Sequence, residues 1–175
     1  MTDAQWDVAD RVQGWLTRDE AEFLHDLCDG PWCEVGCWKG RSTLVLAQTG
    51  YPGLAIDHFK GSPEHPEGTD TRAEFDENLA GYENVGVLPY PFRGAAAMVP
   101  DDLALVFLDA DHGYEQTRLA WQLYAPKVKR GGHVAVHDAA GGHWPEVERF
   151  VGELRANQAW RELPAVHHTV AFQRR

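Results

Sequence analysis

The stretch Trp32–Ala47, WCEVGCWKGRSTLVLA, decides the fold of this chain. An apolar run that suits a strand stops at a loop containing Trp38 and two glycines, Gly36 and Gly40, and then resumes as STLVLA, which suits a helix. A strand, a tight glycine turn and a helix together place backbone amides where they can hold a ligand. The stretch therefore predicts a strand of an open sheet with a ligand site at its carboxyl end.

Strand-like and helical segments alternate along the rest of the chain. Besides 32–35, strands are expected at 53–57, 85–88, 103–109 and 133–138, and helices at 42–49, 72–80, 114–125 and from Pro145 onward. This alternation predicts an α/β fold, a doubly wound and mostly parallel sheet with helices on both faces. The tail at 161–175 holds two strands with no helix between them, so this pair is expected to be antiparallel and to lie at one edge.

A single domain spanning 1–175 is the expectation for a chain of this length. Residues 1–30 are expected to form a helical segment that packs on the core. Thr17 and Glu20 have capping-box spacing, and the apolar positions that follow repeat at helical intervals until Gly30. Four tryptophans are expected to pack and not to face a substrate: Trp6, Trp15, Trp121 and Trp160.

The charge balance excludes some classes of partner. Lys and Arg number 16 against 27 Asp and Glu, a formal net charge of −11, which argues against a nucleic-acid backbone and suits a small-molecule partner or a cation. No run approaches the roughly 18 apolar residues of a membrane helix, and the N-terminus lacks the order of a signal peptide. Three cysteines, expected as free thiols, indicate a cytoplasmic protein. No membrane partner is expected, and a homo-oligomer is an open alternative.

The glycine turn does not match either of the common phosphate-binding motifs. A dinucleotide fingerprint counted from Gly36 requires glycine at positions that Trp38 and Arg41 occupy. A phosphate loop requires one more residue than the spacing from Gly36 to Gly40 provides. The remaining pattern is E-x-G-x-x-x-G, followed by an acid, Asp57, at the end of the next strand.

S-adenosylmethionine (SAM) suits this pattern because it carries no phosphate. Its sulfonium, ammonium and ribose hydroxyls can all interact with carboxylates, and Glu34, Asp57 and Asp109 lie at three expected strand ends. Asp57 is 17 residues beyond Gly40, about where a ribose-binding acid belongs. The start of the helix near Ser42 can face the SAM carboxylate.

Four segments together resemble a known family: CEVGCWKGRSTLVLA, AIDHF, LVFLDADHGYEQT and GGHVAVHDAAG. They resemble the small class I SAM-dependent methyltransferases, in particular the group of macrocin O-methyltransferase-like and cephalosporin-hydroxylase-like proteins. The resemblance covers about residues 30–175 and implies a seven-stranded Rossmann-like sheet with an antiparallel edge strand. It also implies SAM as cofactor, lying across the ends of the first, second and fourth strands.

The resemblance carries cofactor roles to particular positions. The set carried over by position is Glu34, Gly36, Gly40, Ser42 and Asp57. Three further expected cofactor-binding residues lie in the same motifs: Trp38, His58 and Asp109. The resemblance also implies Arg93, which falls where the family often brings a loop near the adenine.

A second group of titratable residues follows the next two strands. The motif DADH, 109–112, leaves the fourth strand, and His137 and Asp138 leave the fifth, so these ends are expected to lie close together. One interpretation is a divalent metal, Mg²⁺ or Mn²⁺, held by Asp109, His137 and Asp138, although an imidazole ligand also suits transition metals. The other is a metal-free acid–base site, with the base among Asp111, His112 and His137.

The resemblance does not decide between these chemistries. Sugar O-methyltransferases of the resembled group carry two acids at the positions of His137 and Asp138. In them the resemblance implies that these acids and the counterpart of Asp109 bind Mg²⁺, and that the counterpart of Asp111 is the base. A third alternative is that His112 and Asp138 hydrogen-bond to each other and only order the loops.

The function expected from these motifs is methyl transfer from SAM to a hydroxyl of a small molecule, by direct in-line displacement. One alternative is a metal-dependent oxygenase or hydroxylase on the same scaffold, since two histidines and a carboxylate could form the facial triad of non-haem iron. Another is a non-catalytic SAM-binding protein. Loops 58–71 and 139–145 are expected to set acceptor specificity, and loop 58–71 is expected to be mobile without ligand and to close near the acceptor.

Overall fold

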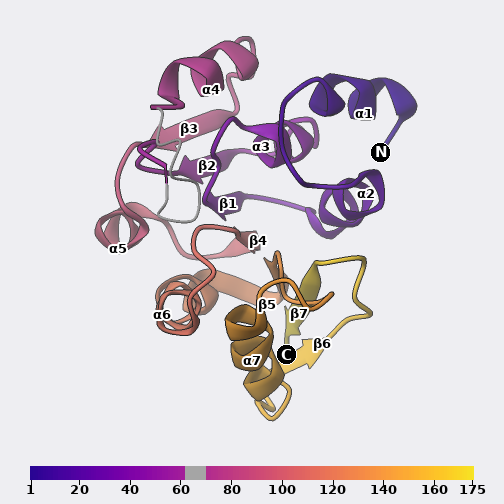
Figure 1. Ribbon diagram of the computed structural model, residues 1–175, viewed down its shortest axis with the longest axis vertical. Helices are drawn as coiled ribbons and strands as arrows, with labels where there is room; N and C mark the ends of the chain where they lie inside the picture. Colours follow the sequence, from indigo (N-terminus) through magenta and orange to yellow (C-terminus); the bar gives the residue numbers. More distant parts are fainter. Residues whose placement is uncertain (62–69) are drawn as a thin grey trace.

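The computed structural model describes residues 1–61 and 70–175, which form a seven-stranded sheet with helices on both faces (Figure 1). The strand order is β3-β2-β1-β4-β5-β7-β6. The strands are β1 (Trp32–Val35), β2 (Gly53–Ile56), β3 (Val85–Leu88), β4 (Leu103–Leu108), β5 (Val128–Val136), β6 (Trp160–Glu162) and β7 (Val170–Arg174). Strands β1 to β5 are parallel, and this confirms the predicted doubly wound class.

The C-terminal strand pair lies at one edge, as expected. Strand β7 runs antiparallel to both β5 and β6 and lies one position in from the edge, so that β6 is the edge strand itself. Strand β5 begins at Val128, five residues earlier than expected, because its register against β4 shifts at a bulge. Gly131 has a φ of +80°, and Gly132 lies so close to the β4 backbone that a Cβ would be 2.8 Å from Ala104 O.

The helices divide between the two faces of the sheet. One apolar cluster includes residues of α1 (Asp3–Asp10), α2 (Arg18–Leu27), α3 (Arg41–Ala47) and α4 (Arg72–Asn78). The other includes residues of α5 (Phe92–Ala95), the 3₁₀ turn Ala96–Met98, α6 (Tyr114–Tyr124), the 3₁₀ turn Ala125–Lys127 and α7 (Pro145–Leu154). Strand residues alternate between the clusters, with Val106 on one side and Phe107 on the other, as period-two patterning requires.

Residues 1–30 pack on the sheet through α3. Thr2 and Thr17 each begin a helix with a capping box, and the Thr17 box uses Glu20 as the sequence predicts. Ala9, Leu24 and further apolar residues of this segment are fully buried in the same cluster as α3. The N-terminal helices are therefore continuous with the core that supports the glycine turn.

The structure also bears on the cysteines, on membrane-spanning helices and on loop 58–71. The three cysteines, Cys28, Cys33 and Cys37, are buried free thiols. In residues 1–61 and 70–175, no helix combines the length and apolarity needed to cross a bilayer. The expected closure of loop 58–71 concerns mostly residues 62–69, which lie outside the described residues.

Candidate active site

The turn between β1 and α3 depends on two glycines in left-handed conformations. Gly36 has a φ of +90°, and a Cβ there would lie 2.2 Å from the carbonyl oxygen of Asp109 at the end of β4. Gly40 has a φ of +91° and begins α3, where a Cβ would lie 2.5 Å from a methyl group of Leu79. Trp38 between them has a φ of +44°, which is rare for a side chain of this size. The turn therefore holds the ends of two strands in close approach.

Asp57, directly after β2, holds this turn through its carboxylate. Its Oδ2 accepts hydrogen bonds from the N–H groups of Cys37 and Trp38 at 2.9 and 2.8 Å. Its Oδ1 accepts one from Phe59 N–H at 2.7 Å. The side chain is half-buried and lines a cavity, so it both fixes the turn and faces the space above it.

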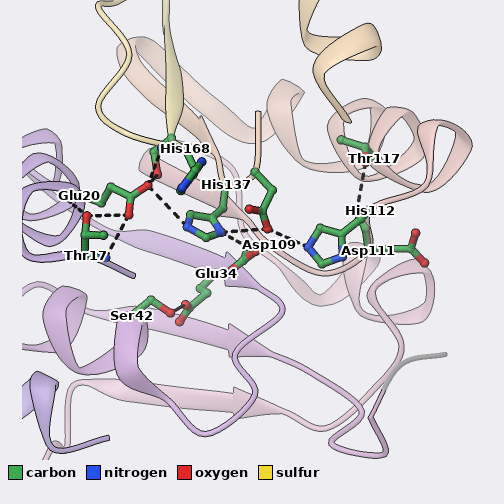
Figure 2. A network of polar contacts seen from close by, with 12 residues as sticks. Thr17, Glu20, Glu34, Ser42, Asp109, Asp111, His112, Thr117, His137 and His168 are labelled. Atoms are coloured by element: carbon green, nitrogen blue, oxygen red, sulfur yellow. Dashed lines mark hydrogen bonds and ion pairs between the residues drawn. The ribbon is translucent and has the colours of Figure 1, made fainter. Parts of the chain in front are cut away.

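Glu34 lies in a different environment from the one its motif implies. It is fully buried, and its two carboxylate oxygens accept hydrogen bonds from the hydroxyls of Ser42 and Thr43, the latter at 2.5 Å (Figure 2). Burial raises the pKa of Glu34 to about 8, against the opposing effect of the two hydroxyls. Glu34 thus supports the first turn of α3 from beneath.

A cavity of about 450 Å³ opens at the carboxyl ends of the strands. The predicted cofactor residues that line it are Gly36, Trp38, Ser42, Asp57, His58 and Asp109. Three others are not among the described residues that line it: Glu34, Gly40 and Arg93. Arg93 is exposed on α5 and donates a hydrogen bond to Gln116 Oε1 at 2.6 Å.

His137 lies at the centre of the second predicted group (Figure 2). Its Nδ1 is 3.3 Å from Asp109 Oδ1 and 3.2 Å from Asp138 Oδ2. Its Nε2 is 3.6 Å from Oε1 of Glu20, a residue of α2. The expected convergence of the β4 and β5 ends is therefore present, and it includes a third carboxylate from the N-terminal segment.

The charges of this cluster stabilise one another. Burial alone would lower the pKa of His137, but Asp109, Asp138 and Glu20 outweigh it and raise that pKa far above its usual value. Burial likewise opposes ionisation of Asp138, yet His112 and His137 hold its pKa well below the usual range. Without a metal, this arrangement favours the imidazolium form of His137 between carboxylates, whereas a metal on Nδ1 would require the neutral imidazole.

His112 extends the cluster toward the cavity. Its Nε2 lies 2.9 Å from Asp138 Oδ2, and its ring stacks on Trp144 with centroids 4.0 Å apart. His112 and Trp144 both line the cavity. The predicted contact between His112 and Asp138 is present, and it lies where a ligand in the cavity can reach it. Asp138 itself has a φ of +56°.

Asp111, the other predicted base, points elsewhere. Its Oδ1 accepts a hydrogen bond from Gly113 N–H at 2.8 Å. Its main-chain oxygen accepts one from Thr117 Oγ1 at 3.2 Å (Figure 2). It lines a small neighbouring hollow beside α6 and is not among the described residues that line the large cavity. Its contacts order the start of α6.

Three side chains of this cluster lie close enough together to share a metal ion. Asp109, His137 and Asp138 each offer one ligand atom, and these atoms all lie within 4.8 Å of one another. Two carboxylates and one imidazole suit a divalent ion, with the imidazole favouring a transition metal. The predicted metal ligands therefore fit such an ion.

The wall of the cavity includes a segment that the sequence interpretation overlooked. Residues 13–17, between α1 and α2, line it in succession. Trp15, expected to pack and not to face a substrate, does pack, since it stacks on Trp38 with centroids 4.8 Å apart, but it is 60% exposed and lines the cavity. Its neighbours in sequence carry no periodic signal that would have placed it at a site. Opposite segments add His143, Trp144 and His168.

Glu20 was also missed as a site residue. The capping-box spacing with Thr17 explained its presence completely at the level of sequence. The sequence did contain one further signal. Glu20 lies four positions before Leu24, so its carboxylate is on the buried apolar face of α2, where a charge needs a partner.

Comparison with known proteins agrees with this geometry. Residues 33–139 match a family model described as a methyltransferase domain. The fold is similar to cofactor-bound Rv0187 from MTB, with a TM-score of 0.71 and 18% identity over 98% of this chain and 88% of that one. It is also similar to the O-methyltransferase NovP, with a TM-score of 0.74 and 22% identity over 89% and 79% of the two chains. The S-adenosylhomocysteine-bound Podospora anserina methyltransferase PaMTH1 matches with a TM-score of 0.70 and 13% identity over 100% and 89%.

Proposed function

Because the chain belongs to the methyltransferase domain family, we propose that it transfers the methyl group of SAM to a hydroxyl of a small molecule. The observation that carries the proposal is that one cavity of about 450 Å³ joins the glycine turn and Asp57 to the cluster around His137. Its volume lies within the range of small-molecule sites, roughly 300–1,000 Å³. The net charge of −11 further favours a small molecule over a nucleic acid as acceptor.

The cofactor half of the cavity suits SAM by its chemistry. The Gly36 turn brings backbone close to the ligand, and Asp57 and Asp109 offer carboxylates to hydroxyl and cationic groups. When bound, SAM supplies an electrophilic methyl group on a sulfonium. The chain's own contribution is to hold that methyl toward the ends of β4 and β5 and to exclude water.

The acceptor hydroxyl must lose its proton as it is methylated. We assign this proton to His112, because Asp138 lies 2.9 Å from His112 Nε2 and stabilises the imidazolium that would form. The carboxylates that face both ring nitrogens of His137 favour its protonated form when no metal is bound, so His112 is the better placed of the two histidines. If a metal is present, Asp109, His137 and Asp138 hold it, and it lowers the pKa of the hydroxyl itself.

The geometry favours methyl transfer over an oxygenase. Among residues 1–61 and 70–175, the group within metal-ligand range contains one imidazole and two carboxylates, whereas the non-haem iron triad has two imidazoles and one carboxylate. The NovP likeness supports oxygen as the acceptor atom, since NovP is an O-methyltransferase.

Acceptor specificity is assigned to segments outside the matched residues 33–139. Residues 13–17, His143, Trp144 and His168 line the cavity and all lie outside that range. The tryptophan stack of Trp15 on Trp38 offers a flat apolar surface at this side.

Calorimetry tests the cofactor part of the proposal. SAM and S-adenosylhomocysteine are expected to bind, and NAD and ATP are not. Selective binding of NAD or ATP would contradict it. An acceptor screen with radiolabelled SAM then tests transfer, and tight cofactor binding with no product from any hydroxyl compound would favour a non-catalytic SAM-binding protein.

Variants and chelation test the reacting centre. His112→Ala is expected to lower turnover roughly 10²–10⁴-fold, the range for a lost general base, with little change in SAM affinity. Treatment with EDTA separates the two chemistries: loss of activity that Mg²⁺, Mn²⁺ or another divalent ion restores indicates metal assistance, and unchanged activity indicates acid–base chemistry alone. Full turnover in His112→Ala would contradict the assignment.

A further inference from the structure

Glu20 is a buried carboxylate that the proposed mechanism does not use. It is 0% exposed and lies in the first turn of α2. Its Oε2 accepts hydrogen bonds from Thr17 N–H at 3.0 Å and from Thr17 Oγ1 at 2.8 Å. Capping explains this oxygen, but it does not explain why the residue is removed from solvent, since a capping glutamate functions equally well at the surface.

The other oxygen faces away from its own helix. Oε1 accepts hydrogen bonds from His168 N–H and Thr169 Oγ1, both at 3.0 Å, and lies 3.6 Å from His137 Nε2 (Figure 2). Burying a carboxylate costs several kcal/mol unless hydrogen bonds and an opposite charge compensate. Here the compensating groups come from the connection before β7 and from the centre of the site.

The His137 ring is hydrogen-bonded through Nδ1 to Asp138 Oδ2 at 3.2 Å, while Nε2 has no hydrogen-bond partner among the described residues and pairs with Glu20 Oε1 only by charge, at 3.6 Å. Nε2 faces Glu20, while Nδ1 faces Asp109 and Asp138. A half-turn of the ring would put carbon atoms where both nitrogens now lie and would lose the contacts at both ends. The ring also meets Phe107 edge-on, with centroids 6.2 Å apart. The side chain is 5% exposed, so water cannot readily replace a lost partner.

We infer that Glu20 is a positioning residue that holds the His137 ring with Nδ1 directed at Asp109 and Asp138. The inference rests on the proposed function for its catalytic consequence, but the geometric role does not depend on it. The role is the same whether Nδ1 carries a proton or binds a metal, because a carboxylate on the far nitrogen of a histidine fixes the ring in both cases. Glu20 lies outside the matched residues 33–139, so this support is supplied by the N-terminal segment.

The test compares two nearly isosteric variants. Glu20→Gln removes the charge facing Nε2, and Thr169→Val removes a hydroxyl that donates to the same Oε1. Turnover, the acceptor KM and S-adenosylhomocysteine affinity are measured for each, together with the ¹⁵N resonances of the His137 imidazole, assigned from their loss in His137→Gln. Glu20→Gln is expected to lower kcat roughly 10- to 100-fold with KM and cofactor affinity within about threefold, and Thr169→Val is expected to stay within about threefold throughout.

The ¹⁵N resonances of the His137 imidazole report the environment of the ring without requiring enzymatic activity. They are expected to move in Glu20→Gln and to stay in place in Thr169→Val. Unchanged resonances and turnover in Glu20→Gln, or equal losses in both variants, would show that Glu20 only packs α2 against the sheet. If Glu20→Gln does not fold, Glu20→Asp keeps the charge one methylene further away, and wild-type resonances and kcat in that variant would overturn the inference. Failure of the wild type to bind S-adenosylhomocysteine would refute the proposed function and leave the resonance comparison intact.

Discussion

Asp57 accepts hydrogen bonds from the N–H groups of Cys37 and Trp38 with one carboxylate oxygen and lines the cavity beside them. Asp57→Ala is therefore expected to weaken S-adenosylhomocysteine binding by removing charge-assisted bonds, each worth about 1.5–3 kcal/mol. Calorimetry measures the loss. Asp70→Ala, at an exposed position where the partner is Lys60, is the control and should bind normally. Equal affinity in Asp57→Ala and wild type would remove Asp57 from the cofactor site.

Glu34 predicts a particular dependence of stability on pH. Its pKa is raised from 4.5 to about 8 by burial, so the folded protein retains a proton that the unfolded chain has released between these values. This contribution is fully present below about pH 4.5 and is lost as the pH rises to about 8, with a slope near 1.4 kcal/mol per pH unit.

The comparison variant for this prediction is Glu34→Gln, which carries no titratable proton. Urea denaturation from pH 5 to pH 8 is expected to show wild type losing stability relative to Glu34→Gln. The exposed control Glu83→Gln should run parallel to wild type. Parallel curves for Glu34→Gln and wild type would mean that Glu34 is ionised in the folded protein.

At the scale of single residues, the sequence predicted which groups gather but not the direction of every side chain. His137, Asp138 and Asp109 follow strand ends, and adjacent strands place such ends together whatever their neighbours are. Glu34 lies within β1, where alternation directs it away from Cys33 and Val35 and toward the hydroxyls of α3. That direction depends on packing between elements, and the motif alone contains no information on it.

At the scale of elements, the turn between β1 and α3 allows a matched pair of substitutions. Gly36→Ala and Gly50→Ala both place a side chain at positive φ, but a Cβ at Gly50 has no described atom within 4 Å, whereas at Gly36 it meets the backbone of Asp109. Gly50→Ala is expected to cost only the conformational penalty, about 1–2 kcal/mol. Gly36→Ala should cost clearly more in chemical denaturation and should weaken cofactor binding. Equal costs would show that the strand ends move apart freely.

The cavity-lining segment 13–17 leads to a prediction about the acceptor. Trp15→Ala removes an exposed ring from the cavity wall, and a stacking contact between this ring and an acceptor would contribute about 0.5–1.5 kcal/mol beyond its buried area. On the proposed function, the acceptor KM is expected to rise roughly 2- to 13-fold, the equivalent of that energy, while kcat changes less. Trp160→Phe, on β6 and packed against Trp121, is the control. A KM unchanged in Trp15→Ala would assign Trp15 to the surface alone.

Elements with a strong pattern were predicted, and those without one were not. The strands from β1 to β4 and helices α6 and α7 follow from periodicity and flanking glycine or proline. Helix α5 has only four residues, Phe92–Ala95, and is too short for a periodic signal. The early start of β5 at Val128 depends on a bulge opposite β4, which is a property of the pair of strands and not of either sequence alone.

At the scale of the whole molecule, α1 and α2 share one apolar cluster with α3 and the sheet. Leu24→Ala, at a fully buried position of α2, is expected to lower the free energy of unfolding by about 2–5 kcal/mol in a single transition. Circular dichroism and tryptophan fluorescence should report the same midpoint. Leu123→Ala on α6, where the side chain is only partly buried, should cost less. A separate early transition in Leu24→Ala would show that residues 1–30 fold as an independent unit.

The contacts of Glu20 have a consequence for how the protein is synthesised. Its partners His168 and Thr169 lie 148 and 149 positions later in the chain. Ribosomes add roughly 5–20 residues each second, so Glu20 is added to the chain roughly 7–30 s before those partners exist. Once residue 139 has been added, a nascent chain contains the whole matched region, residues 33–139, but its carboxylate at position 20 still lacks two donors until His168 and Thr169 follow. The stretch that carries His168 and Thr169 therefore completes the centre, and a chain released before this stretch is added carries the matched region with an unfinished site.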